Sequence, residues 1–195
     1  MTFLDTTPTT RPCPWYVSKH SPGSDMVNQD HGGRPLSYRR AGITVWHPAS
    51  LVSTWFGAGL LPKGPGTWGS AAALPFAWII MDAGGPVSLL AATLACFAVG
   101  WWASSVYVRR TGAEDPSEVV IDEVAGQWLV LLAAPLDPLS YLMGFALFRA
   151  FDIWKPWPVG WADRRIGGGL GIMVDDILAG FYGLGLLVLF NHLRS

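Results

Sequence analysis

The sequence RAFDIWKPWPVGWADRRIGGGLGIMVDDILAG, residues 149–180, decides how this chain folds because it places charge between two strongly apolar runs. Its charged residues are Arg149, Asp152, Lys155, Asp163, Arg164, Arg165, Asp175 and Asp176. Charge beside membrane-grade hydrophobicity costs free energy and usually serves a functional site. The stretch therefore predicts a site at the edge of a membrane.

The composition is that of a membrane protein. Hydrophobic residues make up 51% of the 195 residues and charged residues only 14%, against about 25% in soluble domains. The chain has 11 tryptophans, a residue that gathers at membrane–water interfaces. Its two cysteines, Cys13 and Cys96, fit neither a disulfide framework nor a metal-binding spacing. We expect a lipid bilayer as the partner and no nucleic acid.

Residues 1–40 differ from the rest of the chain. They are rich in Thr, Ser, Pro, Gly and charge and show no hydrophobic periodicity. Such a segment cannot bury enough apolar surface to offset its ordering entropy, so we expect a disordered polar tail. Residues 41–195 are expected to form one membrane-embedded domain.

The apolar runs predict an all-α, polytopic membrane fold, since only helices or closed barrels span lipid and nothing here alternates with period two. About four crossing helices are expected. They cover residues 83–108, 119–136, 139–151 and 172–190, with turns at residues 81–86 and 135–138. Residues 51–61 are too few for a span of about 20 residues and predict a short re-entrant or interfacial helix.

Basic residues fall almost entirely on one side of this predicted topology. Of the 13 Lys and Arg residues, only Arg194 lies on the other side. The positive-inside rule therefore predicts that the motif-bearing loops face the cytoplasm.

Two pairs of adjacent acids lie near the cytoplasmic starts of two predicted helices: Asp122 with Glu123, and Asp175 with Asp176. Capping of the helix N-termini explains one acid at each start, but not two. Four converging carboxylates would repel one another unless a cation lay between them. Oxygen-only ligands of this kind suit Mg²⁺. The sequence thus favours a Mg²⁺ site over capping.

Basic side chains accompany these acids. Arg149 and Asp152 are spaced i,i+3, as are Asp152 and Lys155, so a ladder of local ion pairs is available. The prolines of KPWP, residues 155–158, end the helix and hold Lys155 at the interface, as a phosphate ligand requires. For Arg164, phosphate binding and anchoring to anionic lipid headgroups are equally supported.

Residues 59–70, GLLPKGPGTWGS, predict a turn-rich loop. The loop departs from a phosphate-binding P-loop because Pro65 stands where the lysine should be. Its glycines, among them Gly66, and the hydroxyl of Thr67 could still form an anion nest at a helix start. A plain membrane-entry turn with Thr67 as N-cap is the alternative.

The pattern fits hydrolysis of a phosphate ester on a membrane lipid, with water or an aspartate as the attacking group. The four histidines lie in the tail or at the edges of the predicted spans, which argues against a phosphohistidine mechanism. The competing class is a small ion or solute transporter, or a non-catalytic membrane subunit. Conduction needs polar residues through the full thickness of the membrane, whereas the charges here lie near one face.

Four stretches resemble the phosphatidylglycerophosphatase A family over about residues 46–190. They are PGTWGS (65–70), IDEVAGQW (121–128), FRAFDIWKPWP (148–158) and GGLGIMVDDILAG (168–180). The resemblance implies a Mg²⁺-dependent enzyme of the bacterial inner membrane. Such an enzyme removes the terminal phosphate of phosphatidylglycerophosphate, giving phosphatidylglycerol and phosphate.

We assign working roles on this basis. The catalytic candidates are Asp122, Glu123, Asp175, Asp176 and Lys155. The metal candidates are the same four acids with Asp152, which orients Lys155 or binds the metal. The phosphate-binding candidates are Lys155, Arg149, Arg164, Thr67 and Gly66. Surface roles are expected for Asp163 and Arg165.

Overall fold

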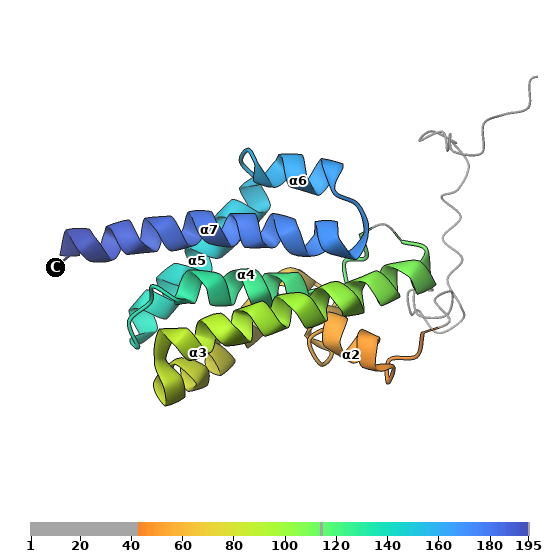
Figure 1. Ribbon diagram of the computed structural model, residues 1–195, viewed down its shortest axis with the longest axis horizontal. Coiled ribbons are helices and arrows are strands. Elements are labelled where there is room, and N and C mark those ends of the chain that lie inside the picture. The colour runs from red at the N-terminus through yellow and green to blue at the C-terminus, as the bar shows by residue number, and fades with distance from the viewer. Residues whose placement is uncertain (1–42, 114, 195) are drawn as a thin grey trace, which may run out of the picture. The chain divides into compact units, whose positions relative to one another are not determined.

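The computed structural model describes residues 43–113 and 115–194, so the tail predicted for residues 1–40 lies outside the described part. Within it the chain is all-helical, as expected, and contains no strand. The elements are α2 (Pro48–Ser53), the 3₁₀ helix η1 (Ala58–Leu60), α3 (Pro65–Thr111), α4 (Ile121–Leu131), α5 (Pro138–Trp154), α6 (Val159–Arg165) and α7 (Gly168–Arg194). Figure 1 shows α3, α4 and α7 packed side by side, with α5 against α7.

Helix α3 consists of two arms that meet at Gly85. This residue has φ 67° and ψ −167°, a conformation that glycine adopts at little cost. The following Pro86 also disfavours helical backbone in the residue before it. The turn predicted at residues 81–86 is therefore confirmed. The arms fold back on each other, so both ends of α3 lie at one end of the bundle (Figure 1).

The loop predicted for residues 59–70 is partly wrong. Helix α3 already begins at Pro65, because proline fits the first helical position, where its missing N–H is not needed. Its N-cap is Gly64, with φ 59° and no side-chain hydrogen bond. Thr67 is thus inside the first turn of α3, and the N-cap considered for it is wrong.

Helix α4 is short and almost wholly buried. Its 11 residues span about 16 Å at 1.5 Å per residue. Gly126 and Gly180 bring α4 and α7 together, since a Cβ on Gly180 would lie 2.8 Å from the carbonyl oxygen of Gly126. Trp128 ties α4 to the first arm of α3 by donating from Nε1 to the Ala73 carbonyl at 2.9 Å. Close glycine contacts of this kind are typical of helices packed in membranes.

Helix α5 is bounded by a cap and a reversal of backbone conformation. At its start Asp137 Oδ1 accepts a hydrogen bond from the Ser140 amide at 2.9 Å, and the turn predicted at residues 135–138 is confirmed. At its end Lys155 has φ 46° and ψ 58°, which stops the helix. The following loop contains α6, after which α7 begins at Gly168.

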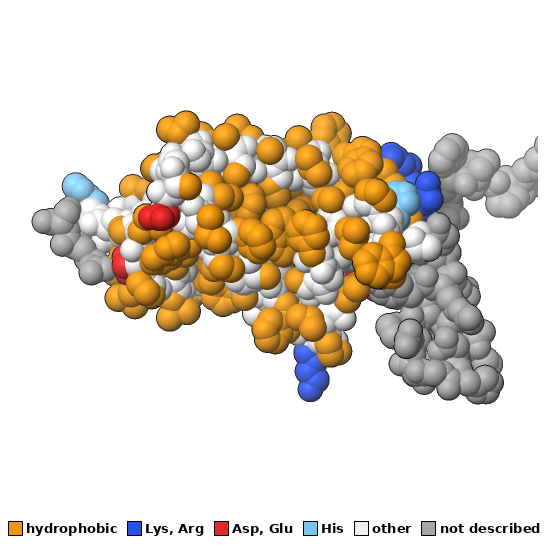
Figure 2. Space-filling view, turned by 90° about the horizontal axis from the view of Figure 1, so that it is seen from below, with side chains coloured by type: hydrophobic (Ala, Val, Ile, Leu, Met, Phe, Trp, Pro, Cys, Tyr) orange, Lys and Arg blue, Asp and Glu red, His pale blue; other side chains and the backbone are white. Residues whose placement is uncertain are grey.

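Two of the described helices, α3 and α7, are long and apolar enough to cross a membrane. Helices α4 and α5, with 11 and 17 residues, are shorter than a span of about 20 residues. Four crossings therefore stay a prediction. Hydrophobic side chains cover the middle of the face in Figure 2, whereas the acidic side chains in view lie at the left-hand end and the basic ones toward the right.

Candidate functional site

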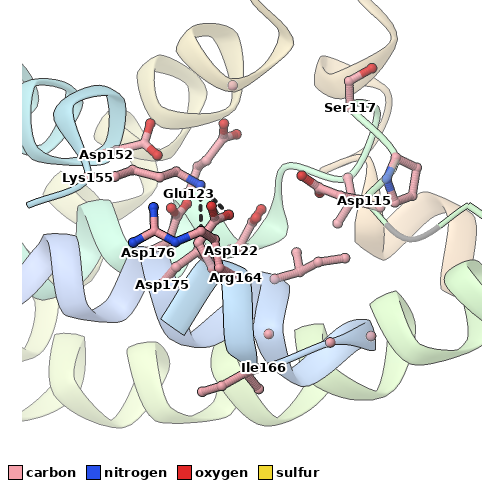
Figure 3. A pocket seen from close by; sticks show the side chains of 18 of the residues that line it. Asp115, Ser117, Asp122, Glu123, Asp152, Lys155, Arg164, Ile166, Asp175 and Asp176 are labelled. Atoms are coloured by element: carbon pink, nitrogen blue, oxygen red, sulfur yellow. Dashed lines mark hydrogen bonds and ion pairs between the residues drawn. The ribbon is translucent and has the colours of Figure 1, made fainter. Parts of the chain in front are cut away.

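A cavity of about 590 Å³ opens where the first turns of α3, α4 and α7 meet the end of α5 and helix α6. Its charged lining residues are Asp115, Asp122, Glu123, Arg149, Asp152, Lys155, Asp163, Arg164, Arg165, Asp175 and Asp176. Figure 3 shows acids from α4 and α7 facing Lys155 and Asp152 across this space. The structure thus gathers the predicted acids and bases into one site.

We call Asp122, Glu123, Asp175 and Asp176 the carboxylate cluster. The first two lie in the first turn of α4, whereas the second two lie about two turns into α7, which begins earlier than predicted. Each of the four has one buried carboxylate oxygen that finds no hydrogen-bond partner among the described residues. A buried carboxylate oxygen without a partner is costly, so these oxygens are suited to bind a cation.

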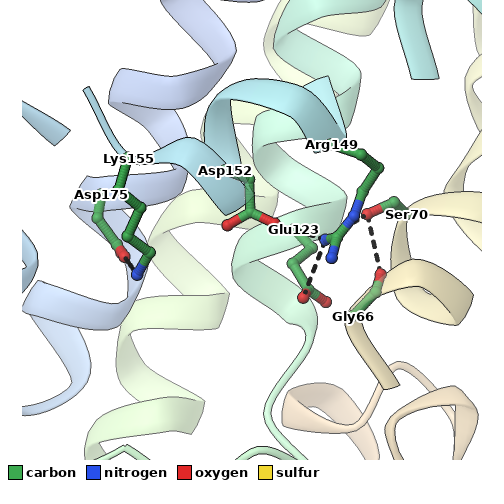
Figure 4. A network of polar contacts seen from close by, with 7 residues as sticks. All are labelled: Gly66, Ser70, Glu123, Arg149, Asp152, Lys155 and Asp175. Carbon is green, nitrogen blue, oxygen red and sulfur yellow. Dashed lines mark hydrogen bonds and ion pairs between the residues drawn. The ribbon is translucent and has the colours of Figure 1, made fainter. Parts of the chain in front are cut away.

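Arg149 is held among acids through one of its guanidinium nitrogens, and it lines the cavity where the sequence predicted a phosphate ligand. Its NH1 atom lies 2.6 Å from Asp152 Oδ2 and 3.4 Å from Glu123 Oε1. The same atom lies 3.5 Å from Ser70 Oγ, which donates to the carbonyl of Gly66 (Figure 4). A Cβ on Gly66 would collide with Glu123 Oε1. Arg149 therefore orients Glu123 and Asp152.

Lys155 is bound between two carboxylates. Its Nζ lies 2.7 Å from Asp163 Oδ1 and 2.8 Å from Asp175 Oδ2. Burial lowers the pKa of Lys155, but its hydrogen bonds to Asp163 and Asp175 outweigh burial and raise the pKa above its usual value. The predicted ladder from Asp152 to Lys155 is wrong. Lys155 leaves the helical conformation, so the i,i+3 spacing no longer brings the two side chains together.

Asp163 is exposed, as expected, but it also lines the cavity and binds Lys155, which the sequence did not indicate. It faces Lys155 from α6, across the turn at residues 155–158, so no helical spacing signals the contact. Arg165, also expected at the surface, lines the cavity together with Arg164. Within the described part of the chain neither arginine forms an ion pair, which leaves both guanidinium groups available.

The start of α3 contributes backbone rather than a side chain. Gly64, Pro65 and Gly66 line the cavity, whereas Thr67 is exposed and does not. The first amides of a helix have no intrahelical acceptor and favour anions. Gly66 therefore lies where the sequence predicted, while Thr67 does not.

A profile of the family described as Phosphatidylglycerophosphatase A matches residues 51–191. The chain belongs to this family. It is 38% identical over 148 residues to phosphatidylglycerophosphatase A of Escherichia coli (strain K12), covering 75% of this chain and 84% of that protein. The Haemophilus influenzae phosphatidylglycerophosphatase A is 37% identical over 141 residues, covering 72% of this chain and 86% of that protein.

A third relative, from Bacteroides thetaiotaomicron, carries the provisional name phosphatidylinositol-3-phosphatase. It is 41% identical over 140 residues, covering 68% of this chain and 86% of that protein. No solved structure matches the chain. The range matched by the family profile, residues 51–191, includes the whole carboxylate cluster. It also includes Arg149 and Lys155, the two basic residues that contact the cluster.

The donor set of the cavity fits Mg²⁺ chemically. All its candidate ligands are carboxylate oxygens, and the carboxylate cluster supplies four that lack partners. Across residues 43–113 and 115–194, no group of three or more His, Cys, Asp or Glu side chains is arranged to hold an ion as it stands. Mg²⁺ commonly takes only one or two carboxylates and completes its shell with water and phosphate oxygens. Such sparse ligation is compatible with this cavity.

Proposed function

We propose that this chain hydrolyses the terminal phosphate monoester of phosphatidylglycerophosphate to phosphatidylglycerol and inorganic phosphate, with Mg²⁺ as cofactor. One observation carries the proposal: a cavity gathers four carboxylates beside Lys155 and two arginines. Among the described residues, each carboxylate has a buried oxygen without a partner and neither arginine forms an ion pair. Acids for a metal and cations for a phosphate are the groups that phosphate-ester hydrolysis requires.

The residues divide the chemistry among them. Lys155 has three N–H donors, two of which bind Asp163 and Asp175, so the third can donate to a phosphate oxygen. The start of α3 and Arg164 add donors for the remaining oxygens. Arg149 keeps the Glu123 carboxylate oriented. Donors fixed before the reaction stabilise the charge that develops on the phosphoryl group.

The carboxylate cluster would hold Mg²⁺, with Asp152 as a further candidate ligand. Bound Mg²⁺ supplies a Lewis acid that neutralises phosphate oxygens and makes a coordinated water more acidic. An unpaired carboxylate oxygen of the cluster accepts a proton from the attacking water. The bond from phosphorus to the water oxygen forms as the bond from phosphorus to the glycerol oxygen breaks, and the leaving glycerol oxygen takes up a proton from solvent water.

We place the enzyme in the bacterial inner membrane, as a multi-pass protein with its cavity facing the cytoplasm. The distribution of basic residues supports this orientation, because Arg149, Lys155, Arg164 and Arg165 all line the cavity. Loops rich in Lys and Arg stay on the cytoplasmic side. Trp154 and Trp157 are exposed and lie within two residues of the cavity residue Lys155 along the chain. Exposed tryptophans suit the headgroup level of the bilayer.

Phosphate release from the purified, detergent-solubilised protein tests the proposal. The substrates are phosphatidylglycerophosphate, phosphatidate and phosphatidylinositol 3-phosphate, each with Mg²⁺ and with a chelator. We expect turnover of phosphatidylglycerophosphate with Mg²⁺ and none with the chelator. Preferential turnover of phosphatidylinositol 3-phosphate would transfer the chain to the activity named for the Bacteroides relative. Absence of phosphate release from all three lipids would favour the transporter alternative.

A further inference from the structure

Asp163 of helix α6 binds the side-chain amine of Lys155, the group that we propose donates to the phosphate. Asp163 Oδ1 lies 2.7 Å from Lys155 Nζ, and Asp175 Oδ2 lies 2.8 Å from the same atom. Asp175 belongs to the carboxylate cluster, whereas Asp163 stands on the separate helix α6. The ammonium group is therefore held between two elements of the fold.

Helix α6 is anchored to the bundle, which fixes the backbone that carries Asp163. Val159 and Ala162 of α6 are fully buried, and a Cβ on Gly160 would lie 2.8 Å from the Lys155 carbonyl oxygen. Tyr182 of α7 donates to the carbonyl of Trp157 at 2.7 Å, which ties the turn before α6 to the bundle. An acceptor on such an anchored element can define where a flexible lysine side chain lies.

Without Asp163, the ammonium group of Lys155 would be attracted by the carboxylate cluster alone. Four acids lie on that side of the cavity, and Asp175 already binds the amine. The lysine would then turn toward the cluster and away from the space where a phosphate lies. The geometry assigns to Asp163 the role of positioning Lys155 for a phosphate monoester. This role requires that Lys155 binds a phosphate group. It rests on the proposed function for the identity of the lipid that carries this phosphate.

The sign of one measurement separates positioning from simple electrostatics. Asp163→Asn removes a negative charge near the anion site, so charge alone predicts tighter binding of inorganic phosphate. Positioning predicts weaker binding, because Lys155 withdraws toward the cluster. Asp115→Asn is the matched comparison, since Asp115 lines the cavity far from Lys155 in Figure 3 and forms no ion pair among the described residues.

The experiment uses the full-length protein in detergent with Mg²⁺. It compares Asp163→Asn, Asp163→Glu, Lys155→Met and the double variant Lys155→Met with Asp163→Asn. Binding of inorganic phosphate is measured by calorimetry, and kcat/KM is measured on phosphatidylglycerophosphate. Asp82→Asn, in the turn between the arms of α3, controls for general effects, and thermal unfolding confirms that each variant is folded.

We expect Asp163→Asn to weaken phosphate binding and to lower kcat/KM about 10- to 100-fold, the scale of a misplacement near 1 Å. Asp163→Glu, which keeps the charge, retains most of the activity, and Asp115→Asn does not weaken phosphate binding. The double variant is no worse than Lys155→Met, because Asp163 acts through Lys155. Unchanged or tighter phosphate binding by Asp163→Asn, or losses that multiply in the double variant, would overturn the assignment.

The two proposals fail in distinguishable ways. A wild-type protein that binds phosphate but releases none from the lipid would refute the lipid substrate, and the phosphate affinities would still decide the role of Asp163. A wild-type protein that binds no phosphate would overturn the positioning role itself.

Discussion

The close contact between α4 and α7 sets the geometry of the carboxylate cluster, and Gly180→Ala tests it. A Cβ on Gly180 would lie 2.8 Å from the Gly126 carbonyl oxygen and 3.3 Å from the Gly126 Cα. Both neighbours are backbone atoms, so no side-chain rotation relieves the clash. Ordinary contact begins near 3.4 Å, so the helices must separate by the difference between 3.4 and 2.8 Å, about 0.6 Å.

This separation acts directly on the site. Gly180 follows Asp176 by four residues, so the two lie on the same face of α7, one turn apart. Moving Gly180 away from α4 therefore moves Asp176 away from Asp122. A misplacement near 1 Å can cost about 100-fold in rate, so we expect kcat to fall about 10- to 100-fold. Overpacking should also cost about 1–3 kcal/mol of stability.

The assay is phosphate release from phosphatidylglycerophosphate with thermal unfolding measured on the same detergent sample. Gly185→Ala is the matched control, because Gly185 lies on the same helix and a Cβ there meets nothing within 4 Å. We expect that control to keep wild-type kcat and to gain up to about 1 kcal/mol of stability from the loss of a helical glycine. Wild-type kcat in Gly180→Ala would show that α4–α7 spacing does not set the rate.

Three further predictions concern the site. Asp122→Asn and Asp176→Asn should abolish turnover while leaving folding and membrane insertion intact, because each removes the charge of a carboxylate that has a buried, unpartnered oxygen among the described residues. Near wild-type activity in either purified variant would contradict the metal assignment. Gly66→Ala should lower kcat strongly, since its Cβ displaces Glu123, and unchanged kcat would show that the Glu123 position is not critical. Thr67→Ala should keep most of its activity because Thr67 is exposed outside the cavity; a large rise in KM would restore it as a headgroup ligand.

The helical fold and the acids of the site could be predicted from local sequence. Apolar run lengths indicated helices, and Gly85 with Pro86 indicated the turn between the arms of α3. The unusual pairs of adjacent acids indicated the carboxylate cluster. Helix boundaries were less predictable. Helix α3 extends back to Pro65, and the short helix α6, which packs against α7, was not expected.

The pairing of charges depended on the tertiary structure. The i,i+3 spacing from Asp152 to Lys155 predicted an ion pair that does not form, since Lys155 leaves the helix with a positive φ. Its partner Asp163 lies on another helix, where no periodicity connects the two residues. Arg149 likewise meets Glu123 of another helix, a contact that no spacing along the chain indicated.

The sequence by itself determined which chemical groups the protein has and that its paired acids lie on two different helices, because hydrophobicity and charge act locally along the chain. Only the tertiary structure decided which of these groups meet. The glycine contact between Gly126 and Gly180 sets how closely the acids of α4 and α7 approach each other. The anchored helix α6 carries Asp163, so that Lys155 lies between Asp163 and Asp175 of α7. Both depend on packing between segments distant in sequence, which no local pattern encodes.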